Sequence, residues 1–161
     1  MALDDRPFQT FNFAVEIYPE GDSKPLCEAA FSECDGLEMT MDVQTIRSGG
    51  ANDRAWRVPA VVTYSNLTLK RGMTGNFELW KWFRRSIEDP YLRADAELVV
   101  LGEDGAAERA RFRLSRCIPA KLKVPPMNAK DGGVAIEDFQ LAYEKIDLVE
   151  PAAPAGEGAA A

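Results

Sequence analysis

Hydrophobic and polar positions alternate along several stretches of the chain, and this period of two is typical of half-buried β-strands. The alternation is clear over residues 11–18 and over 37–44, where the second stretch has one apolar and one strongly polar face. β-Branched and aromatic residues predict another strand over 58–69. A hairpin is expected from 97–101 and 109–114, which flank a turn containing two glycines.

The last strand is expected over 134–148. Its apolar residues change phase near Glu137 and Asp138, and this change predicts a β-bulge there. The proline-containing stretch 118–126 is interpreted as a rigid connection between strands.

One helix is expected over residues 74–87, with Thr74 as its N-cap and Pro90 beyond its other end. On a helical wheel Trp82 points well away from the main apolar stripe, because each residue is turned by about 100°. One of the two tryptophans, Trp80 or Trp82, is therefore predicted to be exposed in an isolated subunit, and Trp82 is the candidate for contact with a partner. The stripe expected to face the core consists of Phe77, Trp80, Phe83 and Ile87.

A polar, glycine-rich segment over residues 47–57 separates two of the predicted strands. The flanking strands would form a long hairpin with Gly49 and Gly50 at its tip. Long loops on compact domains often carry function. From these features alone, two interpretations of this segment remain equally open: it is a contact surface, or it is merely a mobile loop that covers Trp82.

Composition excludes several chemistries. The chain has 19 basic and 26 acidic side chains, a formal net charge of −7 and no histidine. Without histidine it has no Ser-His-Asp or Cys-His nucleophile and no imidazole metal ligand. The acidic balance disfavours a surface for nucleic acid or anionic lipid.

No group of residues forms a recognisable catalytic, cofactor-binding or metal-binding motif. The glycine clusters lack the phosphate-loop pattern, and the acidic pairs lack the calcium-loop pattern. An odd number of cysteines without C-x-x-C predicts reduced thiols. We therefore expect neither enzyme activity, nor a cofactor, nor a metal, and a structural or interaction protein is favoured.

Arginines alternate at positions 109, 111 and 113 on one face of a predicted strand. They could contact a polyanion, but an ordinary solvated face paired with Glu97 and the nearby Asp95 is the favoured interpretation.

Residues 1–148 are expected to form one domain, and the Ala/Pro/Gly-rich tail over 149–161 is expected to be disordered. The start of the chain lacks the features of a signal peptide, and no apolar run approaches the roughly 18 residues of a membrane span. We expect synthesis in the cytoplasm and no membrane anchor.

Six short motifs occur in a characteristic order along the chain. They are Phe13–Ile17, Phe31–Leu37, Arg47–Gly50, Leu67–Gly72, Leu79–Trp82 and Ile136–Glu144. Together they resemble the tail-tube protein family of contractile phages and phage-tail-like injection systems, over nearly the whole chain from about Pro7 to Leu148. Tyr143 stands where many relatives have histidine, a change interpreted as harmless.

The resemblance implies a mainly β fold: an antiparallel β-sandwich or barrel-like tail-tube subunit with one flanking α-helix and a long hairpin arm. Such subunits form hexameric rings that stack into a hollow tube for DNA or protein cargo. The implied partners are further copies of the chain, the contractile sheath, the baseplate, tube-cap proteins and the cargo in the lumen. No specific nucleic-acid binding is implied.

The same resemblance assigns contacts to particular residues. The arm between subunits or rings would include Arg47, Gly49, Gly50, Asn52, Arg54, Trp56 and Arg57. Polar residues of the alternating strand are candidates to line the lumen, namely Glu38, Thr40, Asp42 and Gln44.

Two alternatives remain open at this point. One is a tube-initiator or terminator ring with the same fold. The other is a monomeric β-domain that binds a ligand, with the long loop as its site.

Overall fold

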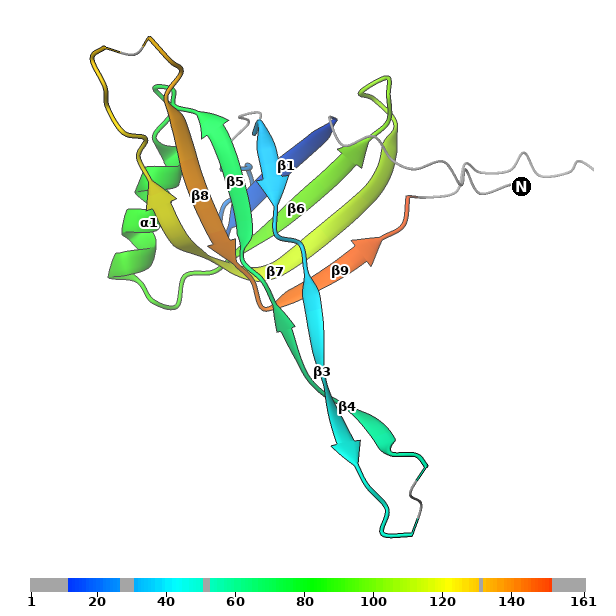
Figure 1. Cartoon of the computed structure of the whole chain (residues 1–161). Helices are drawn as coiled ribbons and strands as arrows, with labels where there is room; N and C mark the ends of the chain where they lie inside the picture. Colours follow the sequence, from blue (N-terminus) through cyan, green and yellow to red (C-terminus); the bar gives the residue numbers. More distant parts are fainter. Residues whose placement is uncertain (1–11, 27–30, 51–52, 131, 152–161) are drawn as a thin grey trace, which may run out of the picture.

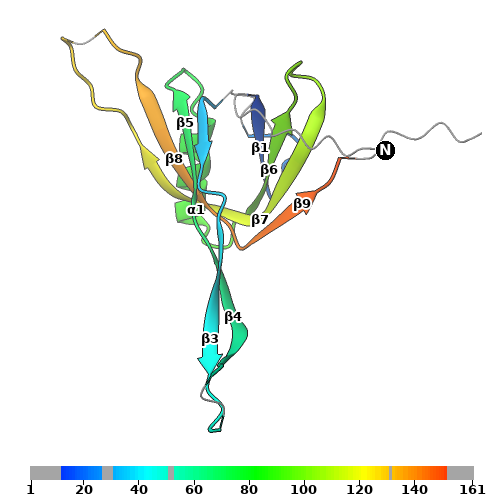
Figure 2. The same cartoon turned by 45° about the vertical axis from the view of Figure 1, so that its right-hand side comes forward.

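The computed structural model describes residues 12–26, 31–50, 53–130 and 132–151. Its body is a seven-stranded antiparallel sheet with the strand order β1-β6-β7-β8-β5-β2, in which β9 also pairs with β7 (Figure 1). A separate two-stranded sheet, formed by β3 Met39–Ile46 and β4 Trp56–Tyr64, extends away from the body (Figures 1 and 2). The strands of the body are β1 Phe13–Pro19, β2 Glu33–Asp35, β5 Leu67–Gly72, β6 Ala94–Leu101, β7 Glu108–Lys123, β8 Ile136–Ala142 and β9 Lys145–Val149.

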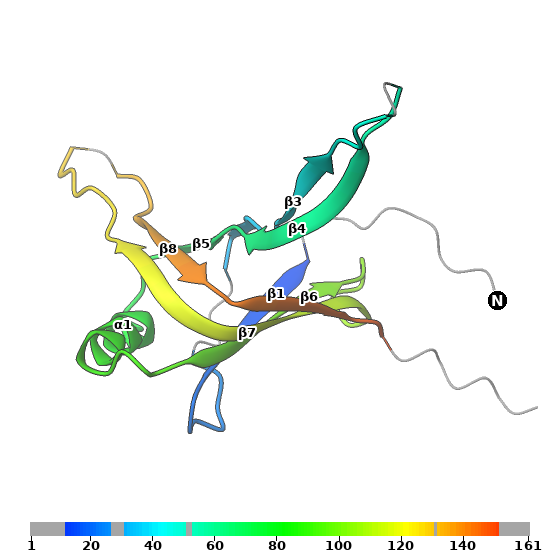
Figure 3. The same cartoon turned by 90° about the horizontal axis from the view of Figure 1, so that it is seen from below.

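Strand β7 belongs to both halves of the folded sheet. Its first part pairs with β6 and β9, and its last part pairs with β8. Between the two parts Arg116 has a φ of 54°, a left-handed conformation that is uncommon outside glycine. The sheet therefore turns within β7, and its two halves enclose one core, as the view from below shows (Figure 3).

The expected rigid connection over 118–126 is wrong in its first part, because β7 continues to Lys123. Pro119 lies inside the strand, and the β7–β8 register shifts between Pro119 and Lys121. A proline is tolerated in a strand at such an irregularity, where its missing N–H leaves no ladder bond unmade.

The expected strand over 58–69 divides into two. Its first part belongs to β4 Trp56–Tyr64, and its second part starts β5 at Leu67. A Cβ on Gly36, which has a φ of 100°, would collide with the backbone carbonyl oxygen of Asn66 at this division. The chain needs glycine there, because two backbone segments meet where the arm leaves the body.

The expected bulge in the last strand is also wrong. The register between β5 and β8 runs without interruption from Leu67↔Leu141 to Gly72↔Ile136. Glu137 shares the buried phase with Phe139 and Leu141, while Ile136 is exposed. A charged residue occupies a core position here, so hydrophobic periodicity alone gives the wrong phase.

Glu137 is stabilised in the core by an ion pair. Arg71 Nε lies 2.9 Å from Glu137 Oε2, and both side chains are at least nine-tenths buried. Arg71 Nη2 also donates a hydrogen bond of 2.9 Å to the carbonyl oxygen of Asn76, just before the helix. This pair links β5, β8 and the start of the helix, since a buried charge requires a partner of opposite sign.

The helix α1 spans Glu78–Glu88 and begins later than expected. Thr74 is not its N-cap: its hydroxyl accepts a hydrogen bond from the N–H of Asn76, whose side chain in turn accepts one from the N–H of Glu78. With eleven residues, this one described helix is too short to span a membrane.

The buried face of α1 is the reverse of the predicted one. Trp82 is only 1% exposed and its ring lies 5.8 Å from that of Phe139, whereas Trp80 is 51% exposed. Leu79 and Trp82 enter the core together, one helical turn apart. Trp82 is therefore not available as an interface residue, and the exposed apolar face of α1 is the stripe that was expected to be buried.

Candidate assembly surfaces

The long hairpin predicted around residues 47–57 is confirmed as a projecting arm. It consists of β3 Met39–Ile46 and β4 Trp56–Tyr64, which pair antiparallel from Met39↔Tyr64 to Ile46↔Trp56. Every residue of β3 is exposed, and β4 is exposed except at two half-buried positions. The arm therefore has no core of its own on either face.

The two faces of the arm differ in polarity near the body. The register shifts between Met41 and Val43, but side chains of the two strands still form two opposite sets. The first set is apolar and consists of Met39, Met41 and Val43 with Tyr64, Val62 and Pro59. We call this set the apolar arm face.

The candidate lumen residues lie on or next to the opposite, polar side of the arm. Thr40, Asp42 and Gln44 are exposed on β3, and Glu38 is exposed just before it. The backbone oxygen of Glu38 accepts a hydrogen bond of 3.2 Å from the N–H of Ser65, which closes the base of the arm. The assignment of these residues to a lumen stays a prediction.

The tip of the arm is cationic on an otherwise acidic protein. Residues 47–57 contain three arginines and one aspartate, whereas the whole chain carries −7. The guanidinium carbon of Arg54 lies 5.8 Å from the ring centre of Trp56, within cation–π distance. Arg47 and Arg54 also line a hollow of about 510 Å³ at the tip.

Within the described part of the chain, nothing restricts a side chain at the tip glycines. A Cβ on Gly49 or Gly50 would meet nothing within 4 Å. Their expected role at a close contact between subunits stays a prediction, and so does that of Arg57, which pairs with Thr45 in the hairpin. Asn52, the remaining arm candidate, lies outside the described residues.

Two of the alternating arginines of β7, Arg111 and Arg113, are paired with carboxylates, as predicted for Glu97. Arg111 contacts Glu97 and lies 2.7 Å from Glu108, and Arg113 lies 3.2 Å from Glu97. The hydrogen bond with Glu108 and the charge of Glu97 raise the pKa of Arg111. Asp95 differs from the prediction, because it accepts a backbone hydrogen bond from Arg116.

A hollow of about 520 Å³ lies where the free edges of the sheet approach each other, between β1–β6 and β2. Burial raises the pKa of the Cys34 thiol in its lining to about 12, so this sulfur stays protonated and is a poor nucleophile. Among the described residues, no group of three His, Cys, Asp or Glu side chains is placed to hold a metal ion. The hollow therefore offers neither a thiolate nor a metal site.

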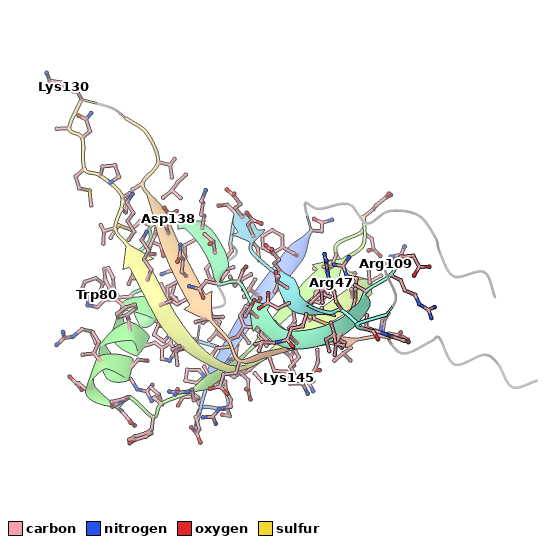
Figure 4. All side chains as sticks on the ribbon, turned by 60° about the horizontal axis from the view of Figure 1, so that its bottom comes forward. Arg47, Trp80, Arg109, Lys130, Asp138 and Lys145 are labelled. Atoms are coloured by element: carbon pink, nitrogen blue, oxygen red, sulfur yellow. The ribbon has the colours of Figure 1, made fainter. Side chains whose placement is uncertain are left out.

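One exposed surface is missed by the sequence patterns. Trp80, Phe83, Arg84 and Ile87 of α1 and Leu122 of β7 line a groove of about 220 Å³ on the outside of the body. Trp80 lies at the outer margin of α1 (Figure 4). The only signal for this groove is that α1 carries more apolar residues than one core-facing stripe can bury.

The chain has an arm without a core, a cationic arm tip and an exposed aromatic helix face. Surfaces of this kind are typical of a subunit that is covered by other chains in an assembly. These features define a self-assembling structural protein. Residues 9–147 match the family model of the T4-like virus tail tube protein gp19, so the chain belongs to this family. The resemblance seen in the sequence is thereby confirmed.

The fold is similar to that of chains in three solved assemblies. In the 6-fold symmetrised baseplate of the anti-feeding prophage (AFP), the TM-score is 0.79 at 23% identity, over 90% of this chain and 97% of that chain. In the PVC sheath-tube complex of an extracellular contractile injection system, extended state, it is 0.76 at 22% identity, over 92% and 95%. In the tube-terminating cap of AFP it is 0.75 at 19% identity, over 94% and 95%. A sequence search among curated proteins gave no match.

Proposed function

We propose that this chain is the inner-tube subunit of a contractile particle. Six copies form a ring, and rings stack into a hollow conduit for DNA or protein cargo within a sheath. The chain contributes stiffness and a bore and carries out no bond chemistry. The family match supports this function, and the uncovered arm is the structural observation that carries it.

The arm makes the contact between subunits. Its β3 strand has eight residues, and at about 3.3 Å per residue it extends roughly 26 Å. A two-stranded hairpin without a core is marginal in water, so a neighbouring subunit is needed to cover it. We assign the contact at the tip to Arg47, Gly49, Gly50, Asn52, Arg54, Trp56 and Arg57.

The polar side of the arm faces the water of the lumen. When the apolar arm face is covered, Thr40, Asp42 and Gln44 remain on the solvated side, with Glu38 at the base. Acidic groups there repel phosphates and would reduce the adhesion of DNA during passage. Reversal of charge at Asp42 tests this assignment, because it should change the passage or retention of cargo without shortening the tube.

Negative-stain microscopy of the purified chain tests the proposed function. Wild-type protein should form six-membered rings and tubes, whereas deletion of residues 48–53 should give folded subunits that do not form tubes. Circular dichroism verifies the fold, and deletion of residues 152–161 serves as a control that keeps the arm. Tubes of normal length without the arm tip would refute its role.

Two further outcomes bear on the alternatives. Wild-type rings that never stack would identify an initiator or terminator ring. The similarity to a chain of the AFP cap is the reason to consider this alternative. A monomer at every concentration would favour a ligand-binding domain.

A further inference from the structure

The arm makes few contacts with the body of its own chain. Within the described residues, β3 and β4 form ladder pairs only with each other, and the arm has no core. The hydrogen bond from the Ser65 N–H to the Glu38 oxygen joins the two strands at the base, but it does not reach the body. The direction of the arm must therefore be set by a side chain at its base.

One aromatic pair connects the arm to the body. The ring centre of Tyr64, the last residue of β4, lies 5.7 Å from that of Tyr143, and the two ring planes are inclined by 49°. Aromatic rings prefer such a tilted contact over a flat sandwich. Among the hydrogen bonds, ion pairs and ring contacts of the described residues of β3 and β4, this pair is the one that reaches the body.

Tyr143 is itself held firmly on the body. It is 8% exposed and lies in the core, in the connection between β8 and β9. The N–H of the next residue, Glu144, donates to the oxygen of Ser115 over 3.1 Å, and its carboxylate lies 2.9 Å from Arg116 Nε. These bonds tie Tyr143 to the place where β7 turns, and the arm leaves the body beside it (Figures 1 and 2).

The ring of Tyr143, and not its hydroxyl, makes the contact. The hydroxyl is buried and has no hydrogen-bond partner of normal geometry among the described residues. Burial raises the pKa of Tyr143, and the nearby backbone of Glu38 opposes this effect. The hydroxyl therefore lies next to the start of the arm without being bonded to it.

From this arrangement we infer that Tyr143 is a positioning residue for the arm. Tyr64 belongs to the apolar arm face, so its contact with Tyr143 fixes both the direction of the arm and the side to which this face turns. Without the contact, the apolar arm face would point in many directions, and only a fraction of the subunits would be ready to join a neighbour. The consequence for assembly rests on the proposed function, whereas the direction of the arm can be measured in a free subunit.

Pulsed electron paramagnetic resonance (EPR) tests the inference in free subunits diluted with unlabelled chain. Spin-labelled p-acetyl-phenylalanine replaces Val61 on the arm and Tyr91 on the body, which are 65% and 86% exposed. Tyr143→Leu removes the ring and should raise the population of arms displaced from their wild-type position roughly three- to tenfold, seen as a broader distance distribution. Tyr143→Phe keeps the ring and should give the wild-type distribution. An unchanged distribution in Tyr143→Leu, or one equally broadened in both variants, would overturn the inference.

A matched control separates positioning from a general loss of stability. Phe139→Leu removes a similar ring contact inside the body, that with Trp82 at 5.8 Å. It should lower the free energy of unfolding and leave the distance distribution as in the wild type. If Phe139→Leu broadens the distribution as much as Tyr143→Leu does, the positioning role is refuted.

The same pair can be removed from the arm side. Tyr64 is only half-buried, so Tyr64→Leu provides the test even if the core does not tolerate Tyr143→Leu. Tyr64→Leu should broaden the distribution to the same extent, and the double variant should broaden it no further. Additive effects of the two changes would show that the rings do not act as a pair.

The outcomes separate this inference from the proposed function. Light scattering should show a longer delay before tubes form in Tyr143→Leu but not in Tyr143→Phe, and an unchanged delay in Tyr143→Leu would refute the role in assembly. If wild-type protein forms no tubes, the proposed function fails, while EPR still tests the position of the arm. If tubes form and the distribution of Tyr143→Leu matches that of the wild type, only the positioning role is wrong.

Discussion

The buried Arg71–Glu137 pair allows a quantitative test of how the body is held together. Both side chains are at least nine-tenths buried, so solvent screens their interaction little. The change Glu137→Leu leaves the guanidinium of Arg71 in the core without its carboxylate. Loss of one member of a buried pair costs about 3–5 kcal/mol, a large part of the roughly 5–15 kcal/mol that stabilises a typical domain.

The reverse change, Arg71→Met, has an additional cost. It leaves the Glu137 carboxylate buried alone and also removes the hydrogen bond to the Asn76 carbonyl, which adds about 1 kcal/mol. The double variant removes both charges and retains apolar volume. We therefore expect it to lose only about 1–2 kcal/mol of unfolding free energy, less than either single variant.

Urea denaturation followed by tryptophan fluorescence measures these differences, since Trp82 is buried beside Phe139. Each variant is measured at two protein concentrations, because assembly would make the midpoint depend on concentration. The free energies of the four proteins form a double-mutant cycle. A loss in the double variant equal to the sum of the single losses would refute the reasoning that the pair acts as a unit.

Two further predictions concern backbone strain and thiol ionisation. The change Gly36→Ala should lower the free energy of unfolding by at least about 1 kcal/mol, because of the positive φ and the collision described above. The control Gly49→Ala should change it by no more than about 0.5 kcal/mol. Equal effects of the two changes in urea denaturation would contradict this prediction. Burial raises the pKa of both Cys34 and Cys117 from 9.0 to about 12. In a Cys27→Ser variant, a thiol reagent at pH 8 should therefore react slowly with these two thiols in the folded protein and faster once urea unfolds it. The folded state keeps these protons while the unfolded chain releases them, so stability should fall as pH rises above 9 towards 12, and a urea midpoint that rises over this range would show the opposite sign.

Much of the fold was predictable because alternation is a strong signal where one strand face is buried. The β6–β7 hairpin is confirmed on this basis, and the long arm, predicted from a polar segment between two alternating strands, is confirmed as well. The family was predictable from the order of its motifs, which the family match confirms.

The failures have physical causes that local patterns do not contain. The phase of β8 was wrong because Glu137 takes a core position opposite Arg71, a residue 66 positions away in sequence. The faces of α1 were exchanged because the helix has two apolar sides, and packing of Trp82 on Phe139 selects one of them. Contacts distant in sequence decided both cases.

The candidate sites were less predictable than the fold. The arm was visible as a polar insertion between strands, but the apolar face that needs a partner appears only when the β3–β4 register is known. The α1 groove could not be identified, because its lining residues Trp80, Phe83 and Ile87 were expected to be in the core. A sequence shows which residues are hydrophobic, but the fold determines which of them remain exposed.

The arm has a kinetic consequence for assembly. A free subunit has an eight-residue strand paired with a nine-residue strand and no core beneath either. On the proposed function, its arm gains its full order only when another chain covers it. The first ring must therefore order several arms before any of them is fully covered, whereas each later subunit arrives at a surface that is already prepared. Such a difference makes initiation slow and growth fast. In a particle built from this chain, the supply of one preformed ring can thus determine when and where tube growth starts.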